Sequence, residues 1–328
     1  NWLRTAYVYD DFGQLVIVVP PKASSAADTE LCYYYAYDER RRMIMKDLPG
    51  AGPLYMVYDK RDRLALTQDS VQRSTNNWAF IKYDSFNRPV MTGVLTLPKT
   101  RLQAKNDFDQ QTTTLYETTG SILGYTNTSF PTGYNEAITL NNIYTVTYYD
   151  DYSYNPGSVY AYKTTHLAGG PSAQSGKTKG LVTGSRVRVL PNGDAVKNSL
   201  ALSVPYYDDF GRVVETISDN RLGAKKDVVY NKYNFAGQIE KTVQVHMQDS
   251  TAQQVVTYTF FYDHQGRLLT EKVKLNNENE ITLSSQSYNE LGEVTARYLH
   301  GSNTGSNFNQ KVDYGYNVKG WLRTINQP

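Results

Sequence analysis

The stretch that decides the fold of this chain is Tyr-Asp-Asp-Phe-Gly-Arg-Val-Val at residues 207–214. Its pattern, Tyr-Asp-x-x-Gly-Arg followed by an aliphatic pair, returns at residues 262–269 and, with Gln for Arg, at residues 9–16. Weaker copies begin at Tyr37, Tyr58, Tyr83, Tyr149, Tyr233, Tyr288 and Tyr316. Seven of the nine intervals between starts are 21 to 29 residues long. This regular return predicts a repeat architecture, in which each unit buries its apolar face against its neighbours.

Each copy of the motif predicts the tip of a β-hairpin. Asp followed three residues later by Gly is typical of a type I turn, and the Gly supplies the left-handed conformation that leads into a bulge. The Asp carboxylate can accept backbone N–H groups of the turn, and Asn, as at Asn234, does the same. The residues that define turn and strand in the three fullest copies are Tyr9, Asp10, Gly13, Tyr207, Asp208, Gly211, Arg212, Tyr262, Asp263, Gly266 and Arg267.

Departures from the motif make finer predictions. Asp62 and Asn87 stand where Gly is missing, and these residue types tolerate positive φ best. Arg41 stands at the same position of the second copy, so that copy is expected to turn differently. Tyr207 and Arg212 are expected to sit across one tip in a cation–π contact, and such pairs would form ladders over successive repeats.

The predicted fold class is all-β: tandem antiparallel hairpins forming a curved strip with an irregular middle. Residues 1–97 and 207–328 are predicted to be regular repeat blocks, with diverged repeats or an insertion at 98–206. Residues 99–111 within that middle predict a short helix, since Leu102, Ala104 and Phe108 lie among polar residues. Residues 168–180, mostly Gly, Ser, Lys and Thr, predict a long mobile loop.

Composition argues against several classes of function. The 34 basic and 32 acidic residues are interspersed, which argues against nucleic-acid binding. The chain contains no run of 18 apolar residues, so no membrane span is expected. Cys32 is the single cysteine and cannot form an intrachain disulfide. The 29 Tyr suit hairpin surfaces that are half buried and half wet, and a glycan-binding surface would use the same residue.

No motif indicates catalysis, a metal or a cofactor. Residues 170–178 look like a phosphate-binding loop, but the glycine spacing is one residue too long and no helix is expected to follow. The four histidines fall in separate segments. Acidic pairs such as Asp208-Asp209 could hold calcium or face each other across a cleft, but turn capping already explains the first Asp of each pair. The chain is therefore expected to be non-enzymatic and free of cofactors.

The repeats resemble the YD repeat of the RHS (rearrangement hotspot) family, which includes bacterial wall-associated and polymorphic-toxin proteins, insecticidal toxin-complex subunits and animal teneurins. The copies cover about two-thirds of the chain. The resemblance implies a spiralling strip of hairpins that winds into a hollow shell around a C-terminal toxin or other cargo. It also implies a core domain that cuts the chain at an Asp-Pro motif. This chain has no Asp-Pro dipeptide, so those residues are not carried over.

The resulting expectation is a structural shell segment of a large secreted or surface-exposed protein, with the rest of the parent chain, its core domain and its cargo, as partner. Residues 1–5 echo residues 320–324, which suggests a piece cut inside a repeat. The alternative is a binding module for carbohydrate or a cell-surface protein. Trp78, which has no counterpart in other repeats, is the candidate for stacking on a ligand.

Overall fold

The computed structural model describes residues 3–23, 25–28, 30–112, 114–131, 138–163, 173–189, 200–220, 225–247, 253–301 and 307–326. The chain forms two compact units. Unit 1 contains Asn1–Tyr148, Ser153–Asn155 and Ser185–Leu200, and unit 2 contains Tyr149–Tyr152, Pro156–Gly184 and Ala201–Pro328. The three predicted blocks remain a prediction.

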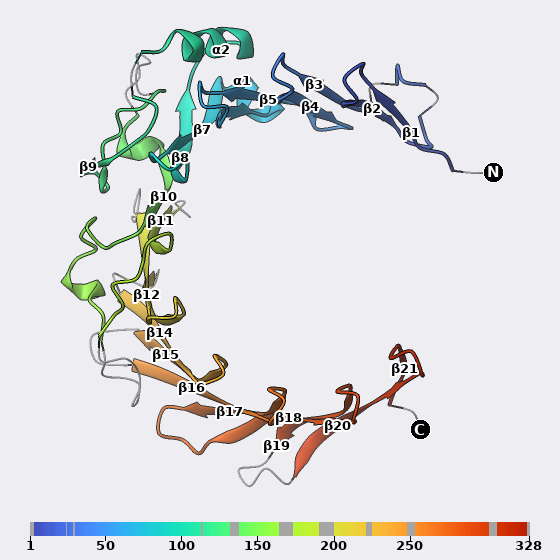
Figure 1. Cartoon of the computed structure of the whole chain (residues 1–328), viewed down its shortest axis with the longest axis vertical. Coiled ribbons are helices and arrows are strands. Elements are labelled where there is room, and N and C mark those ends of the chain that lie inside the picture. The colour runs from blue at the N-terminus through green and yellow to red at the C-terminus, as the bar shows by residue number, and fades with distance from the viewer. Residues whose placement is uncertain are drawn as a thin grey trace. The chain divides into compact units, whose positions relative to one another are not determined.

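The first unit is built from consecutive antiparallel hairpins (Figure 1). Its strands are β1 (Ala6–Tyr9), β2 (Leu15–Val19), β3 (Tyr33–Tyr37), β4 (Met43–Leu48), β5 (Gly52–Tyr58), β6 (Leu64–Gln68), β7 (Asn77–Tyr83), β8 (Pro89–Thr96), β9 (Thr119–Ile122) and β10 (Ile143–Tyr149). From β1 to β8 each strand pairs with the next, and β8 also pairs with β10. In β7, alternate side chains are buried, as expected for a strand with one face against the core.

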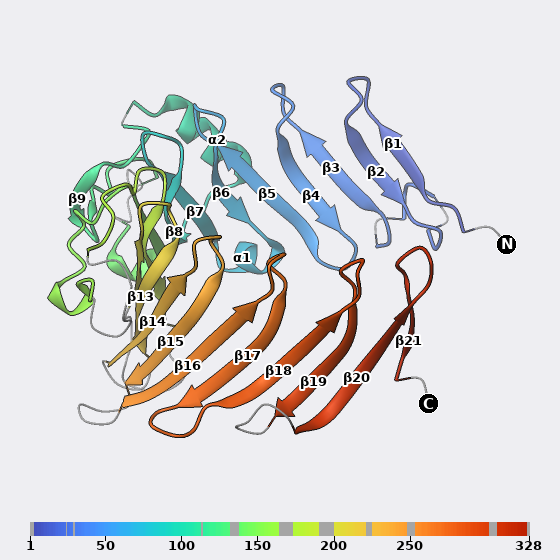
Figure 2. The ribbon, with the colours of Figure 1, turned by 60° about the horizontal axis from the view of Figure 1, so that its bottom comes forward.

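The second unit repeats the same hairpin plan over longer strands. These are β12 (Leu200–Tyr207), β13 (Val213–Asn220), β14 (Lys225–Tyr233), β15 (Ile239–Met247), β16 (Gln253–Tyr262), β17 (Leu268–Leu275), β18 (Ile281–Tyr288), β19 (Val294–Gly301), β20 (Phe308–Tyr316) and β21 (Leu322–Ile325), after β11 (Val182–Arg188). Each strand from β12 to β21 pairs antiparallel with the next. The tips of β14–β15, β16–β17 and β18–β19 therefore share one side of the sheet (Figure 2). The predicted all-β class of antiparallel hairpins is confirmed.

Two insertions interrupt the repeats, at residues 97–142 between β8 and β10 and at residues 151–179 between β10 and β11. One helix lies between β6 and β7 of unit 1, and the others lie in these insertions. The helices are α1 (Ser70–Ser74), α2 (Arg101–Gln110) and two single turns, η1 (Leu140–Asn142) and η2 (Ser158–Tyr160). The α2 helix confirms the helix predicted within residues 99–111. Thr100 caps it through a capping box with Gln103, and its buried residues Ala104 and Phe108 are four apart on one face. Among the described residues, no helix is both long and apolar enough to cross a membrane.

Burial is uneven along the chain. The core of unit 1 gathers around β6, β7, β8 and β10, with Trp78, Phe80, Leu66, Met91 and Ile143 fully buried. The core of unit 2 gathers around β12 to β15, where Leu202, Ile217 and Val245 are buried. The strand β1 is exposed along its whole length. The buried regions coincide with the places where insertions pack on the hairpins.

Candidate functional site: the ladder of hairpin tips

Each complete motif forms the predicted hairpin tip. In the copy at Tyr207, the Gly211 N–H donates to the Asp208 carbonyl at 3.0 Å and the Asp208 N–H donates to the Arg212 carbonyl at 3.0 Å. Asp208 Oδ1 also accepts the N–H groups of Phe210 and Arg212 at 3.0 and 2.9 Å. Gly211 has φ 76°, and the strand register shifts beside Tyr207. Gly13 and Gly266 adopt the same left-handed conformation in the copies at Tyr9 and Tyr262.

The second copy turns in the same way as the others, so the prediction of a different turn there is wrong. Arg41 has φ 62°, as Asp62 does in the next copy, and its N–H donates to the Asp38 carbonyl at 2.8 Å. A left-handed non-glycine residue costs about 1–2 kcal/mol. Here Asp38 offsets that cost by accepting the N–H groups of Arg40 and Arg42. Capping of the turn N–H groups by Asp or Asn, and not the presence of Gly, is what these tips share.

The motif Arg pairs with the motif Asp of its own tip. Arg212 Nε lies 2.7 Å from Asp208 Oδ2, and Arg267 Nε lies 2.6 Å from Asp263 Oδ2. The same pair joins Arg42 to Asp38, Arg63 to Asp59 and Arg88 to Asp84. Burial tends to raise the pKa of Asp38, but the hydrogen bonds and charge of Arg42 lower it overall.

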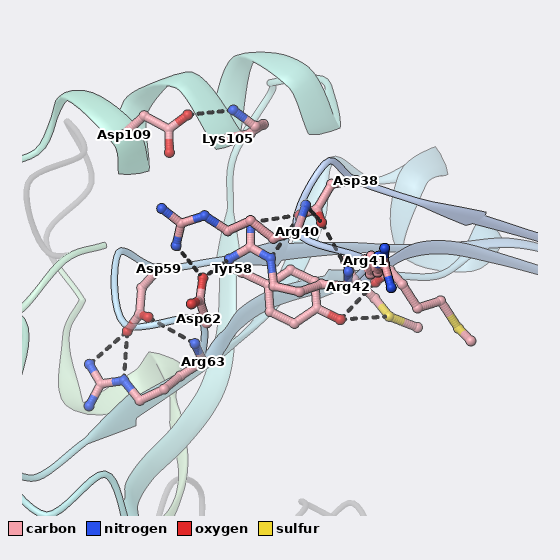
Figure 3. Close-up of polar contacts among 12 residues, drawn as sticks. Asp38, Arg40, Arg41, Arg42, Tyr58, Asp59, Asp62, Arg63, Lys105 and Asp109 are labelled. Atoms are coloured by element: carbon pink, nitrogen blue, oxygen red, sulfur yellow. Dashed lines mark hydrogen bonds and ion pairs between the residues drawn. The ribbon is translucent and has the colours of Figure 1, made fainter. Parts of the chain in front are cut away.

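The flat face of the same guanidinium stacks on the ring of the motif Tyr in the next copy. Arg carbon Cζ lies 4.5 to 4.7 Å from the ring centroid in the pairs Arg42–Tyr58, Arg63–Tyr83, Arg212–Tyr233 and Arg267–Tyr288. The prediction of a cation–π contact between Tyr207 and Arg212 of one tip is thus wrong. Asp208 binds the edge of the Arg212 guanidinium, and the flat face of that group lies on Tyr233 of the next copy. The ladder over successive repeats is present, and Figure 3 shows its Arg42–Tyr58 step.

The hydroxyl of eight of the ten motif Tyr residues completes this tip ladder. It donates to the carbonyl of the residue that opens the second strand of the preceding hairpin. The bonds are Tyr37 to Leu15, Tyr58 to Met43, Tyr83 to Leu64, Tyr207 to Val182, Tyr233 to Val213, Tyr262 to Ile239, Tyr288 to Leu268 and Tyr316 to Val294, at 2.6 to 3.1 Å. This bond was not predicted from the sequence. Its signal was that all ten starts carry Tyr and none carries Phe.

Copies with Gln in place of Arg keep the connection by another bond. The Gln14 side-chain amide donates to the Arg41 carbonyl at 3.1 Å, and the Gln238 amide donates to the Gly266 carbonyl at 2.6 Å. Both acceptors are the left-handed residue of the next tip. Gln therefore replaces an ion pair and a stack by one neutral hydrogen bond between tips.

The irregular copy at Tyr149 is a tip that an insertion has split. The Asp150 N–H donates to the Leu181 carbonyl at 3.0 Å, and Asp150 Oδ1 accepts the Gly180 N–H at 2.7 Å. Gly180 has φ 84° and Val182 receives the Tyr207 hydroxyl, so residues 180–182 take the places of Gly, Arg and the first aliphatic residue. The insertion that separates the two halves spans residues 151–179.

Part of this insertion is the segment that looks like a phosphate-binding loop. Residues 170–172, and residues 168–172 of the predicted mobile loop, lie outside the described residues. Within the described part, the Ser175 N–H donates to the Tyr207 carbonyl at 2.9 Å, and the Thr178 hydroxyl donates to the Asp150 carbonyl. The segment leads into the strand β11 rather than a helix, and Ser175 and Thr178 anchor it to the tips at Tyr207 and Tyr149.

The insertion in unit 1 is anchored at the tip of β7 and β8 by a buried ion pair. Lys82 Nζ lies 3.0 Å from Glu117 Oε1, and both side chains are 0% exposed. Glu117 also accepts hydrogen bonds from Thr126, Thr128 and Ser129. Burial opposes ionisation of Glu117, yet Lys82 and these donors lower its pKa overall. Because each oxygen is satisfied, the pair fixes the position of the insertion on the strand.

A hollow of about 840 Å³ lies between α2 and the tips at Tyr37 and Tyr58, beside the ladder drawn in Figure 3. Its lining carries both signs of charge: Asp38, Glu39, Asp59, Asp109, Arg40, Arg42, Lys60, Arg101 and Lys105. Several of these groups pair with each other or with neighbours, as Lys105 does with Asp109 and Arg40 does with Asp62. The hollow thus presents ion pairs rather than a concentrated charge of one sign.

Trp78, the residue proposed for ligand stacking, is 0% exposed in strand β7. A side chain with no solvent-accessible surface cannot stack on a ligand from solution, so that role is corrected to packing in the core of unit 1. The physical reason is that Trp78 lies on the buried face of β7, together with Phe80 and Lys82. Its position in a central strand was not evident from the repeat pattern.

Comparisons with known proteins give only distant likenesses. No family model and no curated protein matches the chain. The crystal structure of TcdB2-TccC3-Cdc42 is similar over 98% of this chain at 14% identity and TM-score 0.38, and this chain covers 15% of that one. A Photorhabdus luminescens Tc holotoxin pore is similar over 98% at 13% identity and TM-score 0.24, with 21% of that chain covered. Since these TM-scores lie below 0.5, the fold assignment depends on the strands and tips described above.

Proposed function

We propose that this chain is a structural wall segment of a larger RHS-type protein, and that it encloses or displays another part of its parent chain without catalysing a reaction. The observation that carries the proposal is the tip ladder. Eight Tyr hydroxyls and four Arg stacks join neighbouring hairpins at eight of the nine steps between copies of the motif. Such regular connections support a continuous wall.

The polar side chains of the tips are occupied by contacts with each other, which supports a role without catalysis. A catalytic carboxylate or base needs a reacting partner in a concave site. Here the motif Asp residues are bonded to their own turn and to Arg, and the Arg faces are covered by Tyr. The chemistry of the repeats is thus used to hold the repeats together. We place the parent protein at the cell surface or outside the cell, where a shell around a cargo domain would act.

A test uses the parent protein with one step of the ladder removed. The double variant Arg212→Ala/Tyr233→Phe deletes one stack, one hydroxyl bond and the Arg212–Asp208 ion pair, whereas Phe235→Ala changes an exposed residue at the adjacent tip. Limited proteolysis with peptide mapping measures how fast the full-length protein is cleaved outside residues 1–328. We expect the double variant to speed that cleavage at least tenfold and Phe235→Ala to leave it unchanged.

The outcomes separate the two roles considered for this chain. The proposal fails if the full-length protein without substitutions is cleaved outside residues 1–328 as fast as the Arg212→Ala/Tyr233→Phe variant. In that case the segments outside residues 1–328 are not enclosed. Binding of the parent to a glycan array, retained in the ladder variant, would point instead to an adhesion module.

A further inference from the structure

A second part of the insertion packs on the sheet of unit 2, from the strand positions beside the Tyr207 tip to Asp219. Residues 156–163, the clamp segment, contain η2 and lie over β12, β13 and β14. The Tyr160 hydroxyl donates to Asp219 Oδ1 at 2.6 Å, and the Tyr206 hydroxyl donates to the Tyr160 carbonyl. Lys226 also bonds the Tyr160 hydroxyl, at 2.7 Å. The clamp segment is therefore attached to the sheet through the backbone carbonyl and the hydroxyl of Tyr160.

Under this segment lies a carboxyl group that forms no ion pair with any cation in the described part of the chain. Glu215 of β13 is 0% exposed, and its Oε2 accepts the Lys163 N–H at 2.8 Å. Its Oε1 has no hydrogen bond of normal geometry within the described structure, although the Tyr230 side chain approaches the carboxyl and favours its charged form. A buried carboxylate with an unsatisfied oxygen is costly, whereas the protonated group can donate a hydrogen bond and carries no charge.

The groups that face Glu215 come from each packed element and are mostly phenols. They are Lys163 and Tyr162 of the clamp segment, Tyr206 of β12 and Tyr230 of β14. Burial raises the pKa of Glu215 to about 7, and Lys163 and Tyr230 reverse only part of that shift. Glu117 makes a clear contrast: it is equally buried, but it is paired with Lys82 and its pKa is lowered.

We propose that Glu215 makes the docking of the clamp segment depend on pH, holding the segment on the sheet when the carboxyl is protonated and loosening it when the carboxyl ionises. When the segment lifts, Glu215 gains water and returns towards its ordinary pKa of 4.5. The stabilisation is therefore complete below pH 4.5 and is lost as the pH rises to about 7. A shift of this size corresponds to roughly a 300-fold change in the docking equilibrium.

Hydrogen exchange of residues 156–163, corrected for the intrinsic pH dependence of exchange, measures this equilibrium. We expect the protection factors to fall on the order of 50-fold between pH 5 and pH 8 if opening of the segment controls exchange. Glu215→Gln keeps a neutral side chain of the same size, so its protection should not change over that range. Glu290→Gln, at an exposed tip position, is the matched control and should behave as the parent chain.

A second measurement keeps the proposal testable if Glu215→Gln does not fold. Titration of the Glu side-chain carboxyl carbons by ¹³C NMR in the unaltered chain should show one Glu with a midpoint near pH 7. Protection that stays constant from pH 5 to pH 8, protection in Glu215→Gln that falls as in the parent, or no Glu titrating above pH 6 would each overturn the proposal.

Discussion

At the residue scale, the motif Tyr acts through its hydroxyl as much as through its ring. Pairing between β15 and β16 ends at Lys241 and Thr259, and beyond that point the Tyr262 hydroxyl reaches Ile239 at 2.9 Å. The hydroxyl thus bridges two strands where their backbone pairing has stopped. The ring alone would pack there without joining the hairpins.

Tyr262→Phe is expected to lower the free energy of unfolding by about 1 kcal/mol, the net value of one such hydrogen bond. Urea denaturation monitored by circular dichroism measures the change. Tyr258→Phe in the same strand is the control, because the Tyr258 hydroxyl makes no hydrogen bond within the described structure. Equal losses in the two variants would show that the hydroxyl of Tyr262 does not couple the strands.

Gly211 is needed for its backbone conformation and not for space. With φ 76°, a Cβ added there would meet Leu181 at an ordinary 3.9 Å. Gly211→Ala should therefore cost about 1 kcal/mol through strain alone, and Arg41→Gly should stabilise by a similar or smaller amount. Gly176→Ala, where nothing lies within 4 Å and φ is not positive, should be neutral or slightly stabilising in the same thermal unfolding assay.

At the scale of elements, two insertions are attached to the hairpins by different electrostatic means. In unit 1, Lys82 and Glu117 form a buried pair with every oxygen satisfied, so breaking it leaves an unpaired charge. In unit 2, Glu215 has no such cation and is held by burial under the clamp segment. The same residue type, equally buried, thus receives opposite pKa shifts.

Lys82→Met should destabilise unit 1 by about 3 kcal/mol, because Glu117 is left buried without its cation. Adding Glu117→Gln to that variant should restore part of the loss, and Lys105→Met should change stability by under about 0.5 kcal/mol, since its pair with Asp109 is exposed. Urea denaturation tests these values. A double variant less stable than Lys82→Met would contradict the account.

Acid should loosen the insertion of unit 1. The pKa of Glu117 is lowered in the folded chain, so its stabilisation is present above the unfolded pKa of 4.5 and is lost as the pH falls below it. Hydrogen exchange of residues 115–129, corrected for intrinsic rates, should rise between pH 5 and pH 3. That direction is opposite to the one expected for the clamp segment, and a parallel response of both would contradict the pKa assignments.

At the scale of the whole molecule, the repeats should be coupled mainly to their nearest neighbours. Each tip bonds to the next one, and consecutive hairpins in unit 2 share long antiparallel pairings. In such an array, a local defect weakens the adjoining units and fades with distance.

Arg267→Ala combined with Tyr288→Phe removes one step of the ladder in unit 2. We expect hydrogen exchange to rise in the hairpins β16–β17 and β18–β19 and to stay unchanged in β12–β13. His264→Ala, at a tip position exposed to solvent, is the control. A uniform rise over all of unit 2 would show that the unit unfolds as a single cooperative block instead.

Residue types and their spacing along the chain predict the hairpins, their tips, the all-β class and the helix α2. These features depend on residues within three to six positions of each other, such as Asp208 with Gly211 and Thr100 with Gln103. Local hydrogen bonding and steric preference therefore suffice to predict them. Even the tip that contains Arg41, whose turn was predicted wrongly, is capped by its Asp, Asp38.

Only the tertiary structure decided which groups meet between repeats. The partner of the Tyr288 hydroxyl lies 20 residues away, and the Glu117 partner of Lys82 lies 35 residues away. Burial of Trp78, closure of the split tip by Gly180 and the raised pKa of Glu215 likewise depend on which segment packs on which strand. Sheet pairing and packing set those distances, so residue type and spacing along the chain do not reveal them.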